Sequence, residues 1–181
     1  EIISSLFGYG SFDKLSVINS AKALFYFAVG LPAFSIIKVF SAFFFARHNT
    51  KIPFYISLIS VLLNVLISII FFKEIGFIII PIATSISSWF NAILLFIFLR
   101  INNLFSFNLM FINRFIKILL ASVLMGIFFN YVIYFFNDNL FYEENFKAVY
   151  LIGAVIMGLT FYFLIAILIK AFKRSDINLN Y

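Results

Sequence analysis

One lysine interrupts a long apolar run. Lys38 lies in the stretch 30–53, GLPAFSIIKVFSAFFFARHNTKIP. An ionisable residue at membrane depth is rare, and it indicates a wet cavity or a bound anion; a stem that snorkels to the interface is the alternative. Pro32 has no backbone N–H, so we expect a hinge at Gly30 and Pro32. The stretch therefore predicts a functional cation beside a hinge.

A second set of residues could bind a cation through oxygen atoms. Ser60, Asn64 and Ser68 follow one another at spacings of four, and Thr84 and Ser88 do the same farther along the chain. Residues spaced by four share one face of a helix. The two segments are joined by a tight turn, so Asn64 and Thr84 should lie close together. The alternative is that these side chains only join helices, at about 0.6 kcal/mol each.

We recognise no set of catalytic residues in this sequence. There is no cysteine, and the one histidine, His48, lies in a connecting stretch. We find no carboxylate pair, no Ser/His/Asp set and no metal-ligand spacing. We therefore expect a protein that is not an enzyme and that has no resident cofactor.

The elements that must position these residues are membrane helices. The chain has 181 residues, of which 65% are hydrophobic and only 11% charged, and its mean hydropathy is +1.14. A soluble domain is about half apolar and a quarter charged. We predict an all-α polytopic membrane protein with five transmembrane helices. The expected spans are 21–46, 53–72, 75–99, 118–137 and 148–169.

The remaining segments connect these spans. We interpret residues 1–20 as the end of a preceding helix and a loop, 100–117 as a connector, and 170–181 as a basic tail. The first residue is Glu1 rather than methionine, and no signal peptide follows. We therefore interpret the chain as an internal or C-terminal piece of a longer protein.

The charges divide unequally between the two sides of such a bundle. One side carries eight cationic residues, against four on the other. The eight are Arg47, Lys51, Arg100, Arg114, Lys117, Lys170, Lys173 and Arg174. Cationic loops stay in the cytoplasm. We expect the tail to be cytoplasmic, and the net charge of +6 gives no reason to expect a nucleic acid.

Several spaced motifs resemble one known family. They are GLPAF…KV…F-x-ARHNTKIP, then LNV in the next span, then ATS…W-x-NA-x-LL in the third, with LFGYGSF upstream. Together they resemble the lipid II flippase family (MurJ, also called MviN). The close motifs cover residues 6–96. Spans 118–137 and 148–169 agree only in position and hydropathy.

The resemblance implies an architecture and an activity. Members have fourteen helices, and this chain would supply helices ten to fourteen: half of the second lobe of a MOP-superfamily exporter and two additional C-terminal helices. The family moves lipid II, an undecaprenyl-pyrophosphate-linked disaccharide-peptide, from the inner to the outer leaflet of the bacterial inner membrane by alternating access. Its implied partners are this substrate, membrane lipids and the N-terminal lobe of the same chain.

The resemblance also implies roles for the basic residues. Lys38 would face the cationic central cavity through which the pyrophosphate headgroup passes. Arg47 and Lys51 would form a basic hinge at the cytoplasmic mouth of that cavity. The last two helices would form a groove for the lipid tail.

A sodium site known in the family falls on four positions of this chain. They are Asn64, Ser68, Ile80, which contributes its carbonyl, and Thr84. Ser68 stands where the family pattern has a carboxylate, and this change weakens sodium binding. Sodium, protons and the membrane potential alone therefore stay open as driving forces.

Two other functions are compatible with the sequence. One is a different MOP-superfamily exporter, for a polysaccharide-linked lipid, a drug or a cation; the Arg-x-x-Thr-Lys-x-Pro motif that begins at Arg47 argues against it. The other is a membrane scaffold that transports nothing, in which Lys38 and Asn64 could be replaced without consequence.

Overall fold

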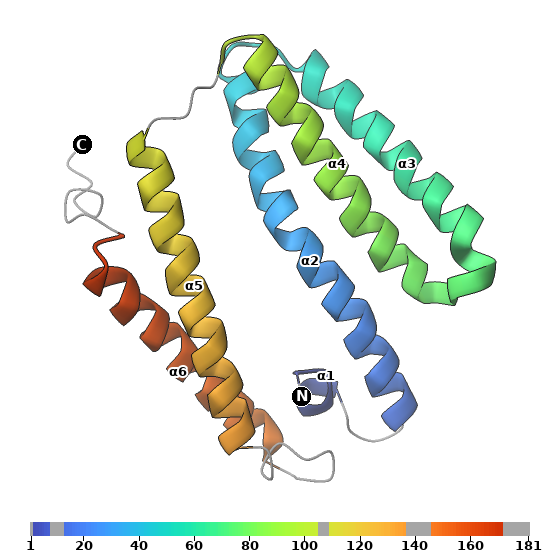
Figure 1. The fold of residues 1–181 in the computed structure, drawn as a ribbon. Helices are drawn as coiled ribbons and strands as arrows, with labels where there is room; N and C mark the ends of the chain where they lie inside the picture. Colours follow the sequence, from blue (N-terminus) through green and yellow to red (C-terminus); the bar gives the residue numbers. More distant parts are fainter. Residues whose placement is uncertain (1, 8–12, 105–108, 137–145, 172–181) are drawn as a thin grey trace. The chain divides into compact units, whose positions relative to one another are not determined.

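The chain folds into helices throughout its described part. A computed structural model describes residues 2–7, 13–104, 109–136 and 146–171, and their regular structure is entirely helical. The helices are α1 (Ile2–Phe7), α2 (Lys14–Phe45), α3 (Lys51–Ile75), the short 3-10 helix η1 (Gly76–Ile78), α4 (Ile79–Ile101), α5 (Leu109–Phe135) and α6 (Lys147–Leu168) (Figure 1). The all-α prediction is confirmed.

Among the described residues, four helical segments are long and apolar enough to cross a membrane. They are Lys14–Phe45, Lys51–Ile101, Leu109–Phe135 and Lys147–Leu168. The second segment has 51 residues and would extend about 77 Å if straight, more than twice the ~30 Å of hydrocarbon. It turns back at η1, so that α3 and α4 form a hairpin (Figure 1). The chain is a multi-pass membrane protein.

The helices extend beyond the apolar spans. α2 begins at Lys14 rather than at Ala21, and α5 begins at Leu109 rather than at Ile118. Hydropathy detects only the part of a helix that hydrocarbon would cover, whereas backbone hydrogen bonds continue into the polar interface. The middle of the connector, the loop between α5 and α6 and most of the tail lie outside the described residues.

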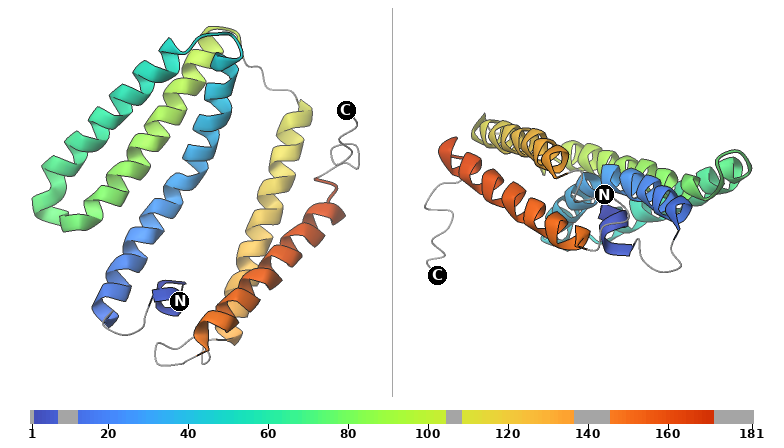
Figure 2. Two further views of the ribbon diagram at one scale, coloured as in Figure 1. Left: turned by 180° about the vertical axis from the view of Figure 1, so that it is seen from behind. Right: turned by 90° about the horizontal axis from the view of Figure 1, so that it is seen from below.

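The chain forms two compact units. The first, which we call the three-helix unit, is Leu15–Ser106 and contains α2, α3, η1 and α4. The second, which we call the α5/α6 unit, joins Glu1–Lys14 to Phe107–Tyr181 and contains α1, α5 and α6. In both views of Figure 2, α3 lies beside α4 and α5 lies beside α6.

The hairpin between α3 and α4 turns at a glycine. Gly76 has φ 72°, in the left-handed region that glycine adopts without strain. Its N–H donates to the Phe72 carbonyl and closes the last turn of α3. Pro81 is the third residue of α4, where a helix has no use for the missing N–H. These residues bring the polar stripes of α3 and α4 face to face.

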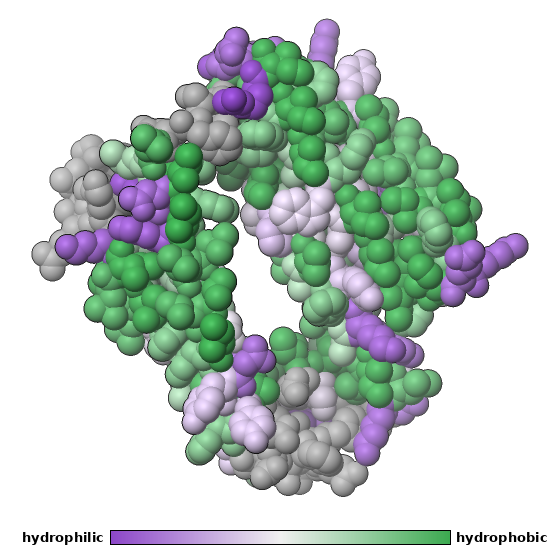
Figure 3. Space-filling view, viewed as in Figure 1, coloured by the Kyte–Doolittle hydropathy of each residue, from purple (hydrophilic) through white to green (hydrophobic). Residues whose placement is uncertain are grey.

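The core of the three-helix unit lies near the end where α2 meets α3. Phe44, Ile56, Leu95 and Leu99 are at most 3% exposed and pack together. The Phe40 ring stacks on Phe96, with a centroid distance of 5.9 Å. Much of the outward surface is hydrophobic (Figure 3), as expected of helices that face lipid.

The α5/α6 unit packs through small residues and aromatic rings. Ala121 and Ala166 are fully buried. The Phe128 and Phe161 rings stack with centroids 4.2 Å apart and planes 10° apart. A Cβ atom on Gly158 would lie 3.2 Å from the Phe129 ring, so this glycine lets the two helices approach closely.

Candidate functional site

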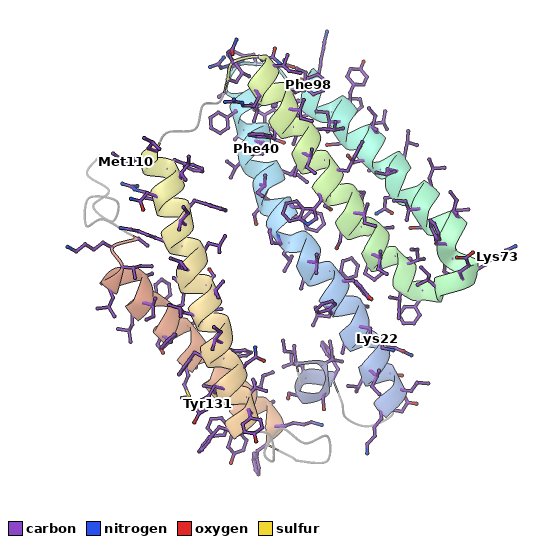
Figure 4. The ribbon with its side chains drawn as sticks, in the orientation of Figure 1. Lys22, Phe40, Lys73, Phe98, Met110 and Tyr131 are labelled. Carbon is purple, nitrogen blue, oxygen red and sulfur yellow. The ribbon has the colours of Figure 1, made fainter. Side chains whose placement is uncertain are left out.

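Arg47 and Lys51 are exposed at the end of the three-helix unit where α2 meets α3. Arg100, near the end of α4, lies at this same end because α4 runs back along α3. Lys22 and Lys73 lie toward the opposite end (Figure 4). Within this unit the charges are sorted as the sequence predicted; which end faces the cytoplasm stays a prediction.

A capped turn fixes the basic residues. The N–H of Asn49 donates to the Phe44 carbonyl (3.0 Å), and His48 takes φ 56°, which ends α2. The side-chain oxygen of Asn49 then accepts from the N–H of Ile52 (3.3 Å) and caps the first turn of α3. Asn49 thus serves both helix ends and holds the turn in one shape.

Lys38 lines a cavity of about 590 Å³ between α2 and α3. The cavity extends to the turn that carries Arg47 and Lys51, and Lys38 is the one charged residue among the described residues of its lining. The other lining residues are Ile37, Ser41, Phe45, Thr50, Pro53, Phe54 and Ser57. An ammonium group with no acid in this described lining favours an anion. The structure thus places Lys38 beside a cavity; its contact with a substrate stays a prediction.

Gly30 packs directly against Ser85 of α4. A Cβ atom on Gly30 would come within 2.8 Å of Ser85 Oγ and 3.2 Å of Ser85 Cα. α2 continues through Pro32 without ending. The structure therefore gives Gly30 a packing role, and the proposed hinge at Gly30 and Pro32 stays a prediction.

Two side chains of α4 bind the backbone of α2, and no pattern in the sequence indicates either contact. Ser85 Oγ donates to the Tyr26 carbonyl, and Trp89 Nε1 donates to the Val29 carbonyl (3.0 Å). Both acceptors are backbone carbonyls of α2. Every residue has such a carbonyl, so the side-chain pattern of α2 does not indicate which ones are used. The contacts attach α4 to the segment around Gly30.

The polar stripes of α3 and α4 meet at Asn64. The Asn64 amide nitrogen donates to Thr84 Oγ1 (3.1 Å) and to Ser87 Oγ (3.3 Å). Thr84 Oγ1 in turn donates to the Ile80 carbonyl (2.8 Å). The predicted proximity of Asn64 and Thr84 is thus observed, and each of these hydrogen bonds lies within the three-helix unit.

The four positions on which the family's sodium site falls are partly occupied by their own hydrogen bonds, and sodium binding there stays a prediction. Asn64 turns its N–H groups toward Thr84, whereas a cation needs the amide oxygen. The Ile80 carbonyl is occupied by the Thr84 hydroxyl, and Ser68 Oγ is buried without a partner among the described residues. The set contains no carboxylate, and the described residues include no cluster of three metal-binding acids, histidines or cysteines. The oxygen atoms that could bind a cation are uncharged, and Thr84 already hydrogen-bonds with Asn64 and with the Ile80 carbonyl.

One further polar pair joins α3 to α4. Asn91 Nδ2 lies 3.5 Å from Ser57 Oγ, nearer the basic end than Asn64, and Asn91 is only 7% exposed. Asn91 belongs to the polar row of α4 in the sequence, but Ser57 is one serine among several. Which serine faces it depends on how the two helices are rotated against each other.

The comparisons with known proteins agree on one family. A family model described as lipid II flippase MurJ matches residues 1–151. A probable lipid II flippase MurJ from Rickettsia prowazekii is 29% identical over 176 residues, which is 97% of this chain and 35% of the relative. The Thermotoga maritima relative of the same description is 32% identical over 98% of this chain and 34% of its own length.

A third relative, the lipid II flippase MurJ of Thermosipho africanus, is 33% identical over 78% of this chain and 28% of its own length. The chain thus spans about a third of the length of the curated relatives it matches. The family match covers the whole three-helix unit and most of the described helices. The chain therefore belongs to the lipid II flippase MurJ family.

Proposed function

We propose that this chain forms part of a transporter that flips lipid II from the inner to the outer leaflet of the bacterial inner membrane. The family and the names of the relatives support a transporter rather than a catalyst. The single observation that carries the proposal is the Lys38 cavity, whose described lining has one cation and no acid and which lies beside an exposed basic turn.

The chemistry of the substrate matches this arrangement. The pyrophosphate of lipid II is an anion, and cationic residues along a low-dielectric cavity attract anions and raise their local concentration. Arg47 and Lys51 would meet the headgroup at the mouth, and Lys38 would meet it inside. A hinge near Gly30 and Pro32 would let the later part of α2 move. The hydrogen bonds from Ser85 and Trp89 of α4 would hold the part of α2 that precedes the hinge.

The orientation and the partners complete the proposal. The basic end of the three-helix unit faces the cytoplasm, because cationic loops are retained there, and the C-terminus lies on that same side. The N-terminal lobe of the complete protein supplies the other wall of the pathway. The exposed apolar faces of α5 and α6 contact membrane lipids, including the tail of the substrate.

The membrane potential or protons, rather than sodium alone, drive the cycle in this proposal. Ser68 brings no charge to the sodium set, and the Asn64 amide directs its nitrogen, rather than its oxygen, at Thr84. Moving one elementary charge across the membrane potential is worth about 2.3 kcal/mol per 100 mV. A cationic cavity that changes sides can draw on this energy without a bound sodium ion.

Replacement of Lys38 tests the proposal directly. We expect Lys38→Ala in the complete protein to abolish growth of a strain depleted of its own flippase, because the cavity loses the charge that its described lining carries. Lys38→Arg should retain growth, and Lys22→Ala, on the same helix toward the other end, is the matched control. Membrane levels are measured by immunoblot. Normal growth with Lys38→Ala at normal protein level would remove Lys38 from the mechanism.

A further inference from the structure

A second cavity, of about 610 Å³, lies between the N-terminal half of α2 and the beginning of α4. We call it the α2/α4 cavity. Its described lining residues are Ile18, Ala21, Lys22, Phe25, Tyr26, Ile75, Ile78 and Ile82. Lys22 marks the end of the three-helix unit that lies opposite the basic turn (Figure 4). The cavity shares no described lining residue with the Lys38 cavity, so it is a separate place in the fold.

The α2/α4 cavity forms where the two helices separate. They are joined at Gly30, which packs against Ser85, and by the hydrogen bond from Trp89 Nε1 to the Val29 carbonyl (3.0 Å). The lining residues of both helices precede these contacts in the sequence, and α2 and α4 diverge toward their first residues (Figure 1). The contacts therefore close one end of the cavity and leave the other end open to the surface.

The lining is apolar except for one cation and one phenol. Lys22 and Tyr26 carry the polar groups, and no acid belongs to the described lining. Glu74 precedes the lining residue Ile75 but is exposed next to Lys73, so these two charges offset each other. Ligand sites are typically apolar with a few polar groups that fix the orientation of the ligand. This lining therefore suits an amphiphile with a long apolar part and a negatively charged head.

The depth of Lys22 in the membrane suits the head of a lipid. α2 has 32 residues and is about 48 Å long, whereas the hydrocarbon layer is about 30 Å thick. A centred α2 therefore extends about 9 Å beyond the hydrocarbon at each end. Lys22 lies eight residues, about 12 Å, after Lys14. It is thus close to the boundary between hydrocarbon and headgroups, where a lysine stem can bring its ammonium group to the phosphate level. Phe25 lies one turn deeper.

We propose that the α2/α4 cavity binds one anionic phospholipid of the surrounding bilayer. Its phosphate contacts the Lys22 ammonium group, and one acyl chain lies against Phe25, Ile78 and Ile82. A cation with no acid in the described lining favours a lipid of net negative charge over phosphatidylethanolamine, whose own ammonium group would lie near Lys22. The bound lipid fills the space between the helices and takes no part in the transport step. The site stands whether or not the protein transports lipid II.

Photocrosslinking in vesicles tests the site without a transport assay. The complete protein is reconstituted into phosphatidylethanolamine and phosphatidylglycerol, with no lipid II present. A trace of either lipid carries a diazirine on one acyl chain, and mass spectrometry maps the adducts after irradiation. We expect adducts at Phe25, Ile78 and Ile82, at about fivefold higher yield with the phosphatidylglycerol probe. This ratio corresponds to about 1 kcal/mol for one basic residue near an anionic lipid.

Four variants separate the charge from the space. Lys22→Gln should make the yields of the two probes equal, whereas Lys22→Arg should keep the preference. Lys73→Gln is the matched control, because Lys73 is exposed toward the same end and lies outside the described lining. It should leave the preference unchanged. Ala21→Phe adds a ring to the lining without changing the charge, and it should abolish the adducts at Ile78 and Ile82. Thermal midpoints show that each variant is folded.

Three outcomes would overturn the proposal. One is an equal yield of the two probes at the cavity in the unsubstituted protein. Another is a preference that survives in Lys22→Gln. The third is the absence of adducts at the lining residues, which would mean that another part of the complete protein covers the cavity. The growth of Lys38→Ala has no bearing on these yields, so this proposal and the proposed function can fail separately.

Discussion

Two helical hairpins of this chain have nearly the same hydropathy and quite different seams. The most apolar 18-residue window has a mean hydropathy of 2.5 within Lys51–Ile101, which contains α3 and α4, and of 2.1 and 2.5 within α5 and α6. Between α3 and α4 the contacts include hydrogen bonds across the helices. Between α5 and α6 they are stacked rings and close apolar packing. Hydropathy alone therefore does not reveal what holds a membrane hairpin together.

The α3/α4 seam is polar because its side chains reach across it. Asn64 bonds Thr84 and Ser87 of the other helix, and Asn91 approaches Ser57. In the α5/α6 unit, Ser122 and Asn130 turn back on their own helix: Ser122 Oγ donates to the Ile118 carbonyl and Asn130 Nδ2 to the Gly126 carbonyl. Both the number of polar residues and their position on the helix separate the two seams: α3 and α4 carry nine Ser, Thr and Asn residues, whereas α5 and α6 carry four.

The two seams suit different tasks. A polar group in hydrocarbon needs a partner, so polar residues at a seam create sites that water or a ligand can complete. A dry seam of small residues and rings gains dispersion contacts and offers no such site. Within the proposed function, we therefore assign the transport role to the three-helix unit and a packing role to the α5/α6 unit.

The largest effect should come from filling the dry seam. Gly158→Val places a side chain against Phe129, which a Cβ atom would already approach to 3.2 Å. Overpacking costs about 1–3 kcal/mol, so the thermal midpoint of the purified complete protein should fall by several degrees. Gly153→Val, on the same helix with nothing within 4 Å, is the matched control. Equal midpoints for the two variants would show that the seam is not tight at Gly158.

Sequence reasoning found the helices and the Asn64–Thr84 pair for a definite physical reason. Apolar length defines a span, and a stripe at spacing four defines a face. A tight turn makes neighbouring helices antiparallel, so two stripes near it can meet. Those three local facts were enough to bring Asn64 to Thr84.

The rest depends on how helices rotate and approach, which no local pattern states. Gly126 and Gly158 look alike, since each follows a small residue four positions earlier, yet of the two only Gly158 meets a neighbouring side chain among the described residues. Ser57 differs from other serines by facing Asn91. The sequence did not predict that α2 and α5 begin before their apolar spans, because the first turns of these helices have low hydropathy. Packing, not composition, decides these features.

A smaller effect should follow from breaking the polar seam. Asn64→Leu removes two hydrogen bonds across the helices, and such bonds average about 0.6 kcal/mol each in membranes. The thermal midpoint should therefore fall by an amount that corresponds to about 1 kcal/mol. Asn130→Leu, whose exposed amide bonds the Gly126 carbonyl of its own helix, should leave the midpoint unchanged. A greater loss at Asn130 than at Asn64 would contradict the distinction between the two seams.

The smallest effect concerns the carboxylate that the polar seam lacks. Ser68→Asp adds a charge at the buried position where Ser68 Oγ has no partner among the described residues. If Asn64 then turns its oxygen inward, the introduced carboxylate, the Ile80 carbonyl and Thr84 can share a sodium ion. Sodium at a concentration equal to its Kd would stabilise this variant by about 0.4 kcal/mol. The measurement compares thermal midpoints in sodium chloride and potassium chloride.

Ser68→Asn is the matched control, because it has the same shape without the charge. A sodium response in Ser68→Asp but not in Ser68→Asn would mean that the polar seam keeps the geometry of a cation site and lacks only its charge. No response in either variant would mean that the hydrogen bonds of Asn64 to Thr84 and Ser87 hold the seam closed. In that case the polar seam at Asn64, like the dry seam, would be a packing device.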